Sequence, residues 1–369
     1  MLFVLLFLLY YSNFTAMGAV IDTRLLVVLL SILALGLSLL SIMRGRRPFL
    51  YILGTLSLLL FIFAIHEYFL RYKQEEITFK QDGNTLYGTL YTPRQSTSSC
   101  LVVFIHGSGQ QERKEYAFHA RQLARNGIAG FAYDKRGSGE SEGDTYAVGY
   151  KGYAQDAVAA IQKLQDMKGF EQVGLFAVSE GEWVSLLVDA LTNIDFIVMV
   201  SAAGTSPLDQ THRELTYRLS RKGFAPEAIR RASELYRNIL TFENDSAQKV
   251  KLEAEIGQVQ HEPWFSAAEE FPAEVYYYPW WNKVMHFDPH RYLSKTDTDI
   301  FVLVGKENES YPYTETLTNF GRYDNAKVAV FDKADHAMLN WRLGKGIPPP
   351  AFASGYLETY TKWIQERCK

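Results

Sequence analysis

Short apolar runs separated by polar loops fill the chain beyond residue 75. An uninterrupted apolar run of strand length is typical of a parallel β-strand that is buried on both faces. The segments 75–80 and 84–91 instead alternate apolar and polar positions around Asp82-Gly83-Asn84, which predicts an antiparallel strand pair. The predicted buried strands are Cys100–Ile105, Gly127–Tyr133, Val173–Val178, Phe196–Val200, Asp299–Val304 and Lys327–Phe331. We therefore expect an α/β fold.

The first 70 residues have a different pattern, with long apolar runs and few charges. Leu25–Met43 and Phe49–Ile65 contain nineteen and seventeen residues without a charge. Helices of about this length span the roughly 30 Å hydrocarbon core of a membrane. Leu2–Leu9 is also apolar and is either a third span or a cleaved signal peptide, although no basic segment precedes it. Residues 1–70 are therefore predicted to be a membrane anchor of two to three transmembrane helices.

Basic residues around the predicted spans indicate their orientation. Arg44, Arg46 and Arg47 lie between the second and third apolar segments, whereas Arg71 and Lys73 follow the third. Positively charged short loops tend to remain in the cytoplasm. We therefore expect the domain after the anchor to lie on the extracytoplasmic side of the membrane.

The stretch 204–293 is longer than a connection between neighbouring parallel strands requires. Its apolar residues recur at helical spacing with charges between them: Leu215, Leu219, Ile229, Leu235 and Ile239. We expect this stretch to be a helical cap inserted after the sixth strand of a core formed by residues 75–203 and 294–369.

Composition narrows the possible functions. The chain has 369 residues and a net charge of −3 without a basic stripe, so we expect no nucleic-acid partner. Its two cysteines, Cys100 and Cys368, lie far apart in the sequence, and we expect no disulfide framework. The histidines are scattered without metal-ligand spacing. We therefore predict neither a catalytic metal nor a cofactor.

The strongest chemical signal is Ala177-Val178-Ser179-Glu180-Gly181 at the end of a predicted strand. A small residue on each side of x-Ser-x is the pattern of a nucleophile elbow, a sharp strand-to-helix turn that exposes the serine hydroxyl. The turn also points the Glu180 backbone N–H at a developing oxyanion. The loop His106-Gly107-Ser108-Gly109 follows an earlier strand, and the Ser108 N–H is the candidate second donor. His106 itself we interpret as ordering its loop.

A histidine in the loop after the last predicted strand completes the candidate machinery. His336 follows Asp332-Lys333-Ala334-Asp335, where it can reach over the serine as general base and later general acid. The alternative is a surface histidine in a polar loop. Asp134 and Arg136, in Asp-Lys-Arg-Gly-Ser-Gly-Glu-Ser after the strand at Tyr133, are expected to brace a turn.

In this order and strand context, these motifs resemble the α/β-hydrolase fold family, especially bacterial serine esterases and lipases of the monoacylglycerol-lipase and serine-aminopeptidase type. The resemblance covers residue 75 to the C-terminus, except for about 204–293. It implies an α/β-hydrolase sheet with helices on both faces, and a cap over a Ser–His–acid triad. The chain departs from the family at the elbow, where Ala177 and Glu182 stand in place of glycines.

The triad acid is the larger departure. The family pattern places an aspartate at position 308, where this chain has Asn308. Glu309 and Glu307 flank that position, and we favour Glu309 as the acid. Asp209 is a further alternative, and without an acid the chain would be a Ser–His dyad or an impaired enzyme.

The function expected from these features is a membrane-anchored serine hydrolase that cleaves carboxylic esters, including lipids or acylglycerols. Trp264, Trp280 and Trp281 are expected to line an apolar substrate wall in the cap, although packing of cap against core or contact with the membrane interface would use the same residues. A peptidase or a thioesterase on the same scaffold is an alternative, and Glu269 or Glu270 would then bind a substrate amine. A catalytically silent binding protein is the remaining alternative, because fold does not fix function.

Overall fold

The structure is a computed structural model that describes residues 14–16, 19–21, 55, 58, 59, 62, 71–95, 99–272, 275–341 and 351–368. The predicted membrane anchor, residues 1–70, lies almost wholly outside these residues. Among the residues that are described, no helix is long and apolar enough to cross a membrane. Two short strands, β1 (Phe14–Ala16) and β2 (Ala19–Ile21), fall within the predicted anchor region.

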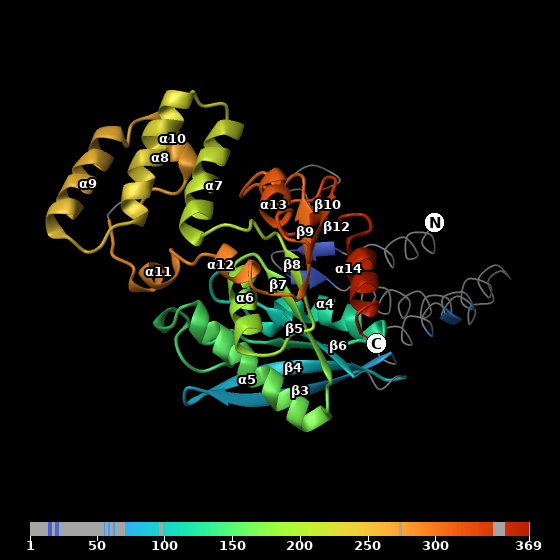
Figure 1. The fold of residues 1–369 in the computed structure, drawn as a ribbon. Helices are drawn as coiled ribbons and strands as arrows, with labels where there is room; N and C mark the ends of the chain where they lie inside the picture. Colours follow the sequence, from blue (N-terminus) through green and yellow to red (C-terminus); the bar gives the residue numbers. More distant parts are fainter. Residues whose placement is uncertain are drawn as a thin grey trace, which may run out of the picture.

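An eight-stranded sheet forms the centre of the molecule (Figure 1). Its order is β10-β9-β8-β7-β5-β6-β4-β3, and β4 runs antiparallel to both of its neighbours whereas the other pairs are parallel. The strands are β3 (Tyr72–Gln81), β4 (Asn84–Pro93), β5 (Cys100–Ile105), β6 (Ala129–Tyr133), β7 (Gln172–Val178), β8 (Phe196–Val200), β9 (Asp299–Gly305) and β10 (Ala326–Phe331). This arrangement confirms the predicted α/β-hydrolase fold.

Alternate residues of the central strands point into two separate cores. Leu101, Val103 and Ile105 of β5 pack in one core with α5 (Tyr150–Lys168) and α6 (Gly181–Leu191). Val102 and Phe104 pack in the other with α4 (Arg113–Arg125) and α14 (Tyr356–Gln365). Helices therefore cover both faces, which is why the central strands are apolar throughout.

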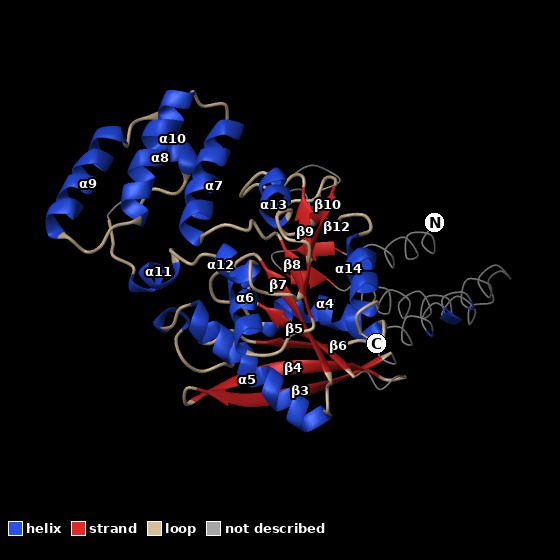
Figure 2. Cartoon of the chain, viewed as in Figure 1, coloured by secondary structure: helices blue, strands red, loops and turns tan. Residues whose placement is uncertain are grey.

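A helical cap is inserted between β8 and β9 (Figure 2). It consists of α7 (Pro207–Arg221), α8 (Pro226–Leu240), α9 (Ser246–Val259), α10 (Pro263–Ala268), α11 (Pro279–Val284) and α12 (His290–Leu293). The Ser206 hydroxyl accepts from the Asp209 N–H, and Pro207 follows, so the first cap helix begins at a well-formed N-terminus. Leu215, Leu219 and Leu235 belong to a buried cluster inside the cap, which therefore has a core of its own.

A disulfide is present, although no disulfide framework is visible in the sequence. Cys100 and Cys368 are joined, with their Cα atoms 5.4 Å apart. Cys100 begins β5 and Cys368 follows α14, and the packing of that helix beneath the sheet brings together residues 268 positions apart. The pairing could not be predicted from the positions of the two cysteines in the sequence, because it depends on how the helix packs in the tertiary fold.

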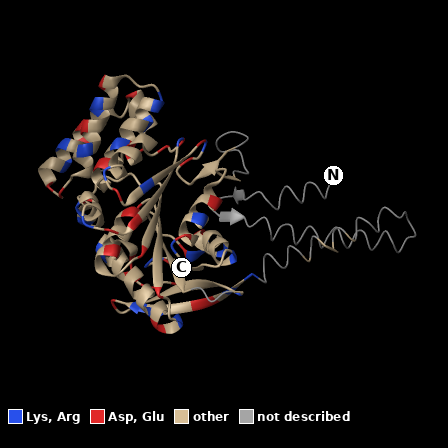
Figure 3. Ribbon diagram, turned by 45° about the vertical axis from the view of Figure 1, so that its right-hand side comes forward, with Lys and Arg blue, Asp and Glu red and all other residues tan. Residues whose placement is uncertain are grey.

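A small second sheet lies beside the core. It has the order β11-β12-β1-β2, in which β11 is Leu339–Asn340 and β12 is Ala351–Phe352. Phe14 of β1 pairs with Ala351 of β12. Helix α13 (Tyr313–Phe320) follows the loop after β9 and precedes β10. Charged residues of both signs are interspersed over cap and core (Figure 3), as the sequence suggested.

Candidate active site

Ser179 occupies a strained turn between β7 and α6. Its φ is +52°, in the left-handed region that non-glycine residues rarely adopt, and its N–H donates to the Val200 carbonyl at 2.9 Å. At Gly181 an added Cβ would lie 2.8 Å from the Ile105 carbonyl oxygen, so only glycine fits this crossing. The turn is therefore built as a nucleophile elbow, with strain at the residue whose hydroxyl it presents.

His336 lies against this serine. Its Nε2 is 3.1 Å from the Ser179 Oγ, within hydrogen-bond distance. The Ser201 hydroxyl donates to the His336 carbonyl at 2.6 Å, and the buried Asp335 carboxylate accepts from the N–H groups of Ala337 and Leu339. Burial lowers the pKa of His336 from its ordinary value, and the negative charges of Glu309 and Asp335 oppose this shift. The backbone around His336 is therefore held in place, and burial favours the neutral imidazole, the form that a general base requires.

The residue beside the other ring nitrogen is Asn308. Its Oδ1 is 3.3 Å from the His336 Nδ1 and also accepts from the Ser310 N–H at 2.9 Å. The side chain is fully buried, in the loop after β9. A neutral amide oxygen can accept from Nδ1–H and orient the ring, but it brings no negative charge.

The predicted acids have other partners or surroundings. Glu309 accepts from the backbone N–H of His336 at 3.1 Å, so its carboxylate holds the histidine loop. Glu307 is exposed and lines a surface pocket with Arg221 and Lys333. Asp209 accepts from the Ser206 hydroxyl at 2.8 Å in the first turn of α7. The side chain beside the His336 Nδ1 is therefore that of Asn308, and not that of the favoured candidate Glu309 or of Glu307.

The loop after β5 lies next to the elbow. The Gly107 N–H donates to the Gln111 side chain at 2.7 Å and to the Tyr116 hydroxyl at 3.0 Å. Lys135 donates to the Gly107 carbonyl at 2.9 Å and to the Glu180 carboxylate at 2.7 Å. Burial raises the pKa of Glu180, and Lys135 opposes this. The two segments that carry the predicted donors, the N–H groups of Ser108 and Glu180, are thus connected through Lys135.

Neighbouring polar residues have structural partners. The His106 Nε2 lies 2.6 Å from the Tyr133 carbonyl, and burial lowers the pKa of His106 to about 3. Asp134 accepts from the Arg113 guanidinium at 2.6 Å, and Arg136 pairs with the buried Asp156 at 2.5 Å. These contacts brace the turn after β6, as the sequence suggested.

Glu182, the departure from glycine after the elbow, is buried beneath the site. Its carboxylate accepts from the N–H groups of Ala203 and Gly204, both at 2.9 Å. Burial raises the pKa of Glu182 to about 8, although these two hydrogen bonds oppose the shift. The side chain fastens the loop after β8 to α6, a role that its sequence position gave no sign of.

The three cap tryptophans do not share one surface. Trp280 and Trp281 line a largely apolar cavity of about 680 Å³ with Tyr146, Tyr276 and other residues. Trp264 is 2% exposed and belongs to the buried core of the cap. The cap therefore contains an aromatic cavity, but Trp264 supports its wall from within.

The acidic residues of the cap already have cationic partners. Glu270 also lines this cavity, and it pairs with Arg218 at 2.6 Å. Glu269 is more exposed and pairs with Lys222 at 2.8 Å.

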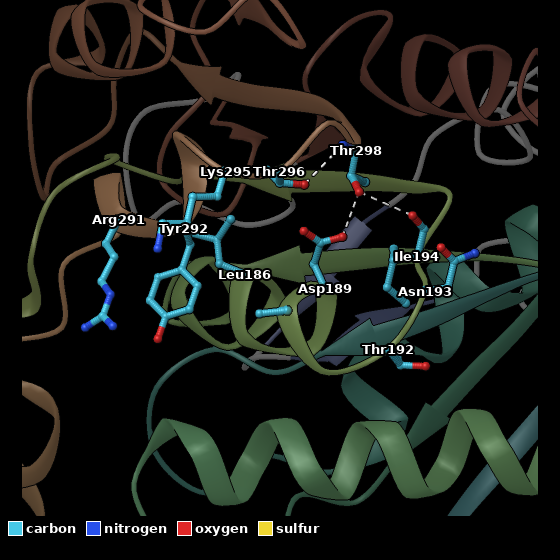
Figure 4. Close-up of a pocket in the computed structure, with 11 residues that line it drawn as sticks. Leu186, Asp189, Thr192, Asn193, Ile194, Arg291, Tyr292, Lys295, Thr296 and Thr298 are labelled. Atoms are coloured by element: carbon cyan, nitrogen blue, oxygen red, sulfur yellow. Dashed lines mark hydrogen bonds between the residues drawn. The ribbon is translucent and has the colours of Figure 1, made fainter.

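A separate polar pocket of about 430 Å³ lies near the C-terminal end of α6 (Figure 4). Asp189, Arg291 and Lys295 line it, and the Thr298 hydroxyl donates to Asp189 at 2.7 Å. This pocket adjoins the amino ends of β8 and β9, whereas Ser179 and His336 follow the carboxyl ends of their strands. In open α/β sheets ligands bind outside the carboxyl ends, which favours the Ser179 region as the site. Within the described ranges, no group of three or more His, Cys, Asp or Glu residues is placed to hold a metal ion.

Comparison with known proteins supports the fold. Residues 97–244 match the family model described as serine aminopeptidase, S33. Est1E from Butyrivibrio proteoclasticus, solved with ferulic acid, has a TM-score of 0.51 and 16% identity, covering 79% of this chain and 96% of that one. An esterase from Pyrococcus furiosus, PF2001, has a TM-score of 0.49 and 16% identity, covering 81% and 92%. The esterase EaEST from Exiguobacterium antarcticum has a TM-score of 0.47 and 14% identity, covering 79% and 100%. No curated protein matches the sequence.

Proposed function

We propose that this chain is a membrane-anchored serine hydrolase that cleaves carboxylic esters through an acyl-enzyme on Ser179, because it has the α/β-hydrolase fold and its residues 97–244 match the serine aminopeptidase family model. The observation that carries the proposal is the 3.1 Å contact between Ser179 Oγ and His336 Nε2 at a strained elbow. Nucleophile and base within hydrogen-bond reach, with a third group orienting the base, are the signature of an activated serine.

The proposed reaction uses these groups in turn. His336 takes the Ser179 proton as the hydroxyl oxygen attacks the ester carbonyl, and the resulting oxyanion accepts from the N–H groups of Ser108 and Glu180. The imidazolium then protonates the leaving alcohol, which departs and leaves an acyl-enzyme. Water, deprotonated by His336, attacks this ester and releases the acid and free Ser179. Asn308 holds the imidazole orientation through Nδ1 in both halves.

The cap supports an ester rather than an N-terminal peptide as substrate. A peptidase that trims N-termini needs a free carboxylate for the substrate amine, but Glu270 is paired with Arg218 and Glu269 with Lys222. The cavity beside Trp280 and Trp281 is instead largely apolar, which suits an acyl chain or an aromatic group, although Ser179 and His336 are not among its lining residues. The serine aminopeptidase match keeps peptidase activity as the alternative.

The extracytoplasmic location is part of the proposal. The disulfide between Cys100 and Cys368 supports it, because disulfides persist mainly in oxidising compartments. The arginines between the second and third predicted spans favour the same orientation.

The test uses the full chain in detergent micelles, with p-nitrophenyl esters of increasing acyl length and aminoacyl p-nitroanilides as parallel substrates. We expect ester turnover and labelling by a fluorophosphonate probe, both abolished by Ser179→Ala. Turnover of the anilides in preference to the esters would favour the peptidase. A folded protein with neither turnover nor labelling would refute the hydrolase assignment and favour a silent binding protein.

A further inference from the structure

A buried ion pair lies directly beside the two peptide groups assigned to the oxyanion. Lys135 and Glu180 are 3% and 2% exposed, and their charged atoms are 2.7 Å apart. Lys135 follows β6 and also lies over the Tyr153 ring, 4.4 Å from its centroid. A buried ion pair is weak evidence for stability, because desolvation offsets much of the attraction between the charges. Its contacts are therefore the better guide to its role.

The first contact fixes a peptide plane. Lys135 Nζ donates to the Gly107 carbonyl at 2.9 Å, and this carbonyl shares its peptide group with the Ser108 N–H. In a trans peptide the C=O and N–H point in opposite directions. Holding the carbonyl toward Lys135 therefore turns the Ser108 N–H away from Lys135. The preceding peptide is fixed too, because the Gly107 N–H donates to Gln111 and Tyr116.

The second contact concerns charge. Glu180 follows the nucleophile directly, and its own N–H is the other oxyanion donor. A carboxylate on this residue without a counter-charge would repel the negative charge that develops on the substrate oxygen. The ammonium of Lys135 cancels this charge at 2.7 Å, inside the protein where screening by water is weak.

We propose that Lys135 is a positioning residue for the oxyanion site, where it orients the Gly107–Ser108 peptide and neutralises Glu180, which in turn holds Lys135 in place. This inference rests on the proposed function, since it assigns a role within ester hydrolysis. It joins three separate segments, the loop after β5, the loop after β6 and the elbow, into one unit.

The experiment measures kcat and KM for p-nitrophenyl butyrate with Lys135→Met, Glu180→Gln and the double variant in the full chain. Removing an oxyanion donor costs on the order of 10²–10³ in kcat, and misorienting one should cost about 10- to 100-fold. We expect this loss for Lys135→Met with KM changed less than about threefold, and a smaller loss for Glu180→Gln, in which Lys135 still holds Gly107. The double variant buries no unpaired charge, so it remains informative if Lys135→Met fails to fold.

Arg136→Met is the matched control, because it removes the neighbouring buried ion pair with Asp156 from the same loop. A trifluoromethyl ketone, whose tetrahedral adduct carries an oxyanion, should bind more weakly to the Lys135 variants but not to folded Arg136→Met. A folded double variant with unchanged kcat and unchanged inhibitor affinity would overturn the inference while leaving the hydrolase assignment intact. Failure of the unaltered chain to turn over any ester would instead overturn both.

Discussion

Replacing Asn308 by aspartate should strengthen the proposed catalytic base. The Asn308 Oδ1 lies 3.3 Å from the His336 Nδ1, so Asn308→Asp would place a carboxylate against the imidazolium that forms when Ser179 loses its proton. At this distance and an effective dielectric constant of about 20, the attraction is about 5 kcal/mol.

Part of this attraction is offset, because position 308 is fully buried and a carboxylate there loses its hydration, at a cost of several kcal/mol. The Ser310 N–H, which already donates to the Asn308 Oδ1 at 2.9 Å, would compensate some of that loss. We expect the pKa of His336 to rise by about 1–2 units, which is about 1.4–2.7 kcal/mol. If the same stabilisation reaches the transition state, kcat/KM should rise by about 10- to 100-fold.

The assay is the pH dependence of kcat/KM for p-nitrophenyl butyrate. Burial lowers the pKa of His336, so the acidic limb of the unaltered protein should lie below the ordinary histidine value, and activity should persist at more acidic pH. In Asn308→Asp this limb should move to higher pH. In Glu309→Gln, which removes a charge that raises the pKa of His336, it should move to lower pH. A folded Asn308→Asp protein with an unchanged limb and unchanged kcat/KM would refute a role for position 308 in orienting the base.

Three further predictions concern the scaffold of the site. Gly181→Ala should lower both thermal stability and kcat, because the new Cβ would lie 2.8 Å from the Ile105 carbonyl oxygen. A variant with unchanged melting temperature and turnover would contradict this close approach of the two backbone segments. Burial raises the pKa of Glu182 to about 8 in the folded state, above its value in the unfolded chain. Between these two pKa values the folded state binds a proton that the unfolded state has lost, so the free energy of unfolding should fall by a few kcal/mol as pH rises from about 5 to 8. Glu182→Gln should flatten that fall in urea unfolding measured at the two pH values, and an equal slope in both proteins would count against the buried carboxyl. Reduction of Cys100–Cys368, or its replacement by two serines, should cost about 2–4 kcal/mol of unfolding free energy without abolishing ester turnover. Identical urea midpoints with and without reductant would argue against the bond.

The sheet was largely predictable because its signal is local. The strands from Cys100 to Ile105 and from Val173 to Val178 are buried on both faces. A strand without a polar face forms an uninterrupted apolar run, which can be recognised in a single sequence. The elbow could also be predicted from local sequence, because steric crowding at Gly181 restricts which residues can occupy the turn. The order of the motifs along the chain then gave His336 its expected place.

The features that could not be predicted from the sequence depend on contacts between distant segments. Nothing near Glu182 indicates that its carboxylate reaches the loop after β8, and nothing near Lys135 indicates a partner 45 positions away. The disulfide between Cys100 and Cys368 was missed for the same reason. The tryptophans also illustrate the limit, because Trp264 and Trp280 are equally aromatic in sequence but only Trp280 lines the cavity.

Three features around the nucleophile share an electrostatic consequence. Asn308 brings no charge to His336, Lys135 cancels Glu180, and the raised pKa of Glu182 keeps its carboxyl largely protonated at neutral pH. The negative charges that remain near the nucleophile are those of Glu309 and Asp335, both of which act on His336 from its own loop. Such a site stabilises an imidazolium less than one with a buried aspartate, but it also repels a developing oxyanion less. Its catalysis should thus depend more on the oxyanion donors than on the charge behind the base. Disturbing Lys135 should accordingly cost more activity than removing Glu309.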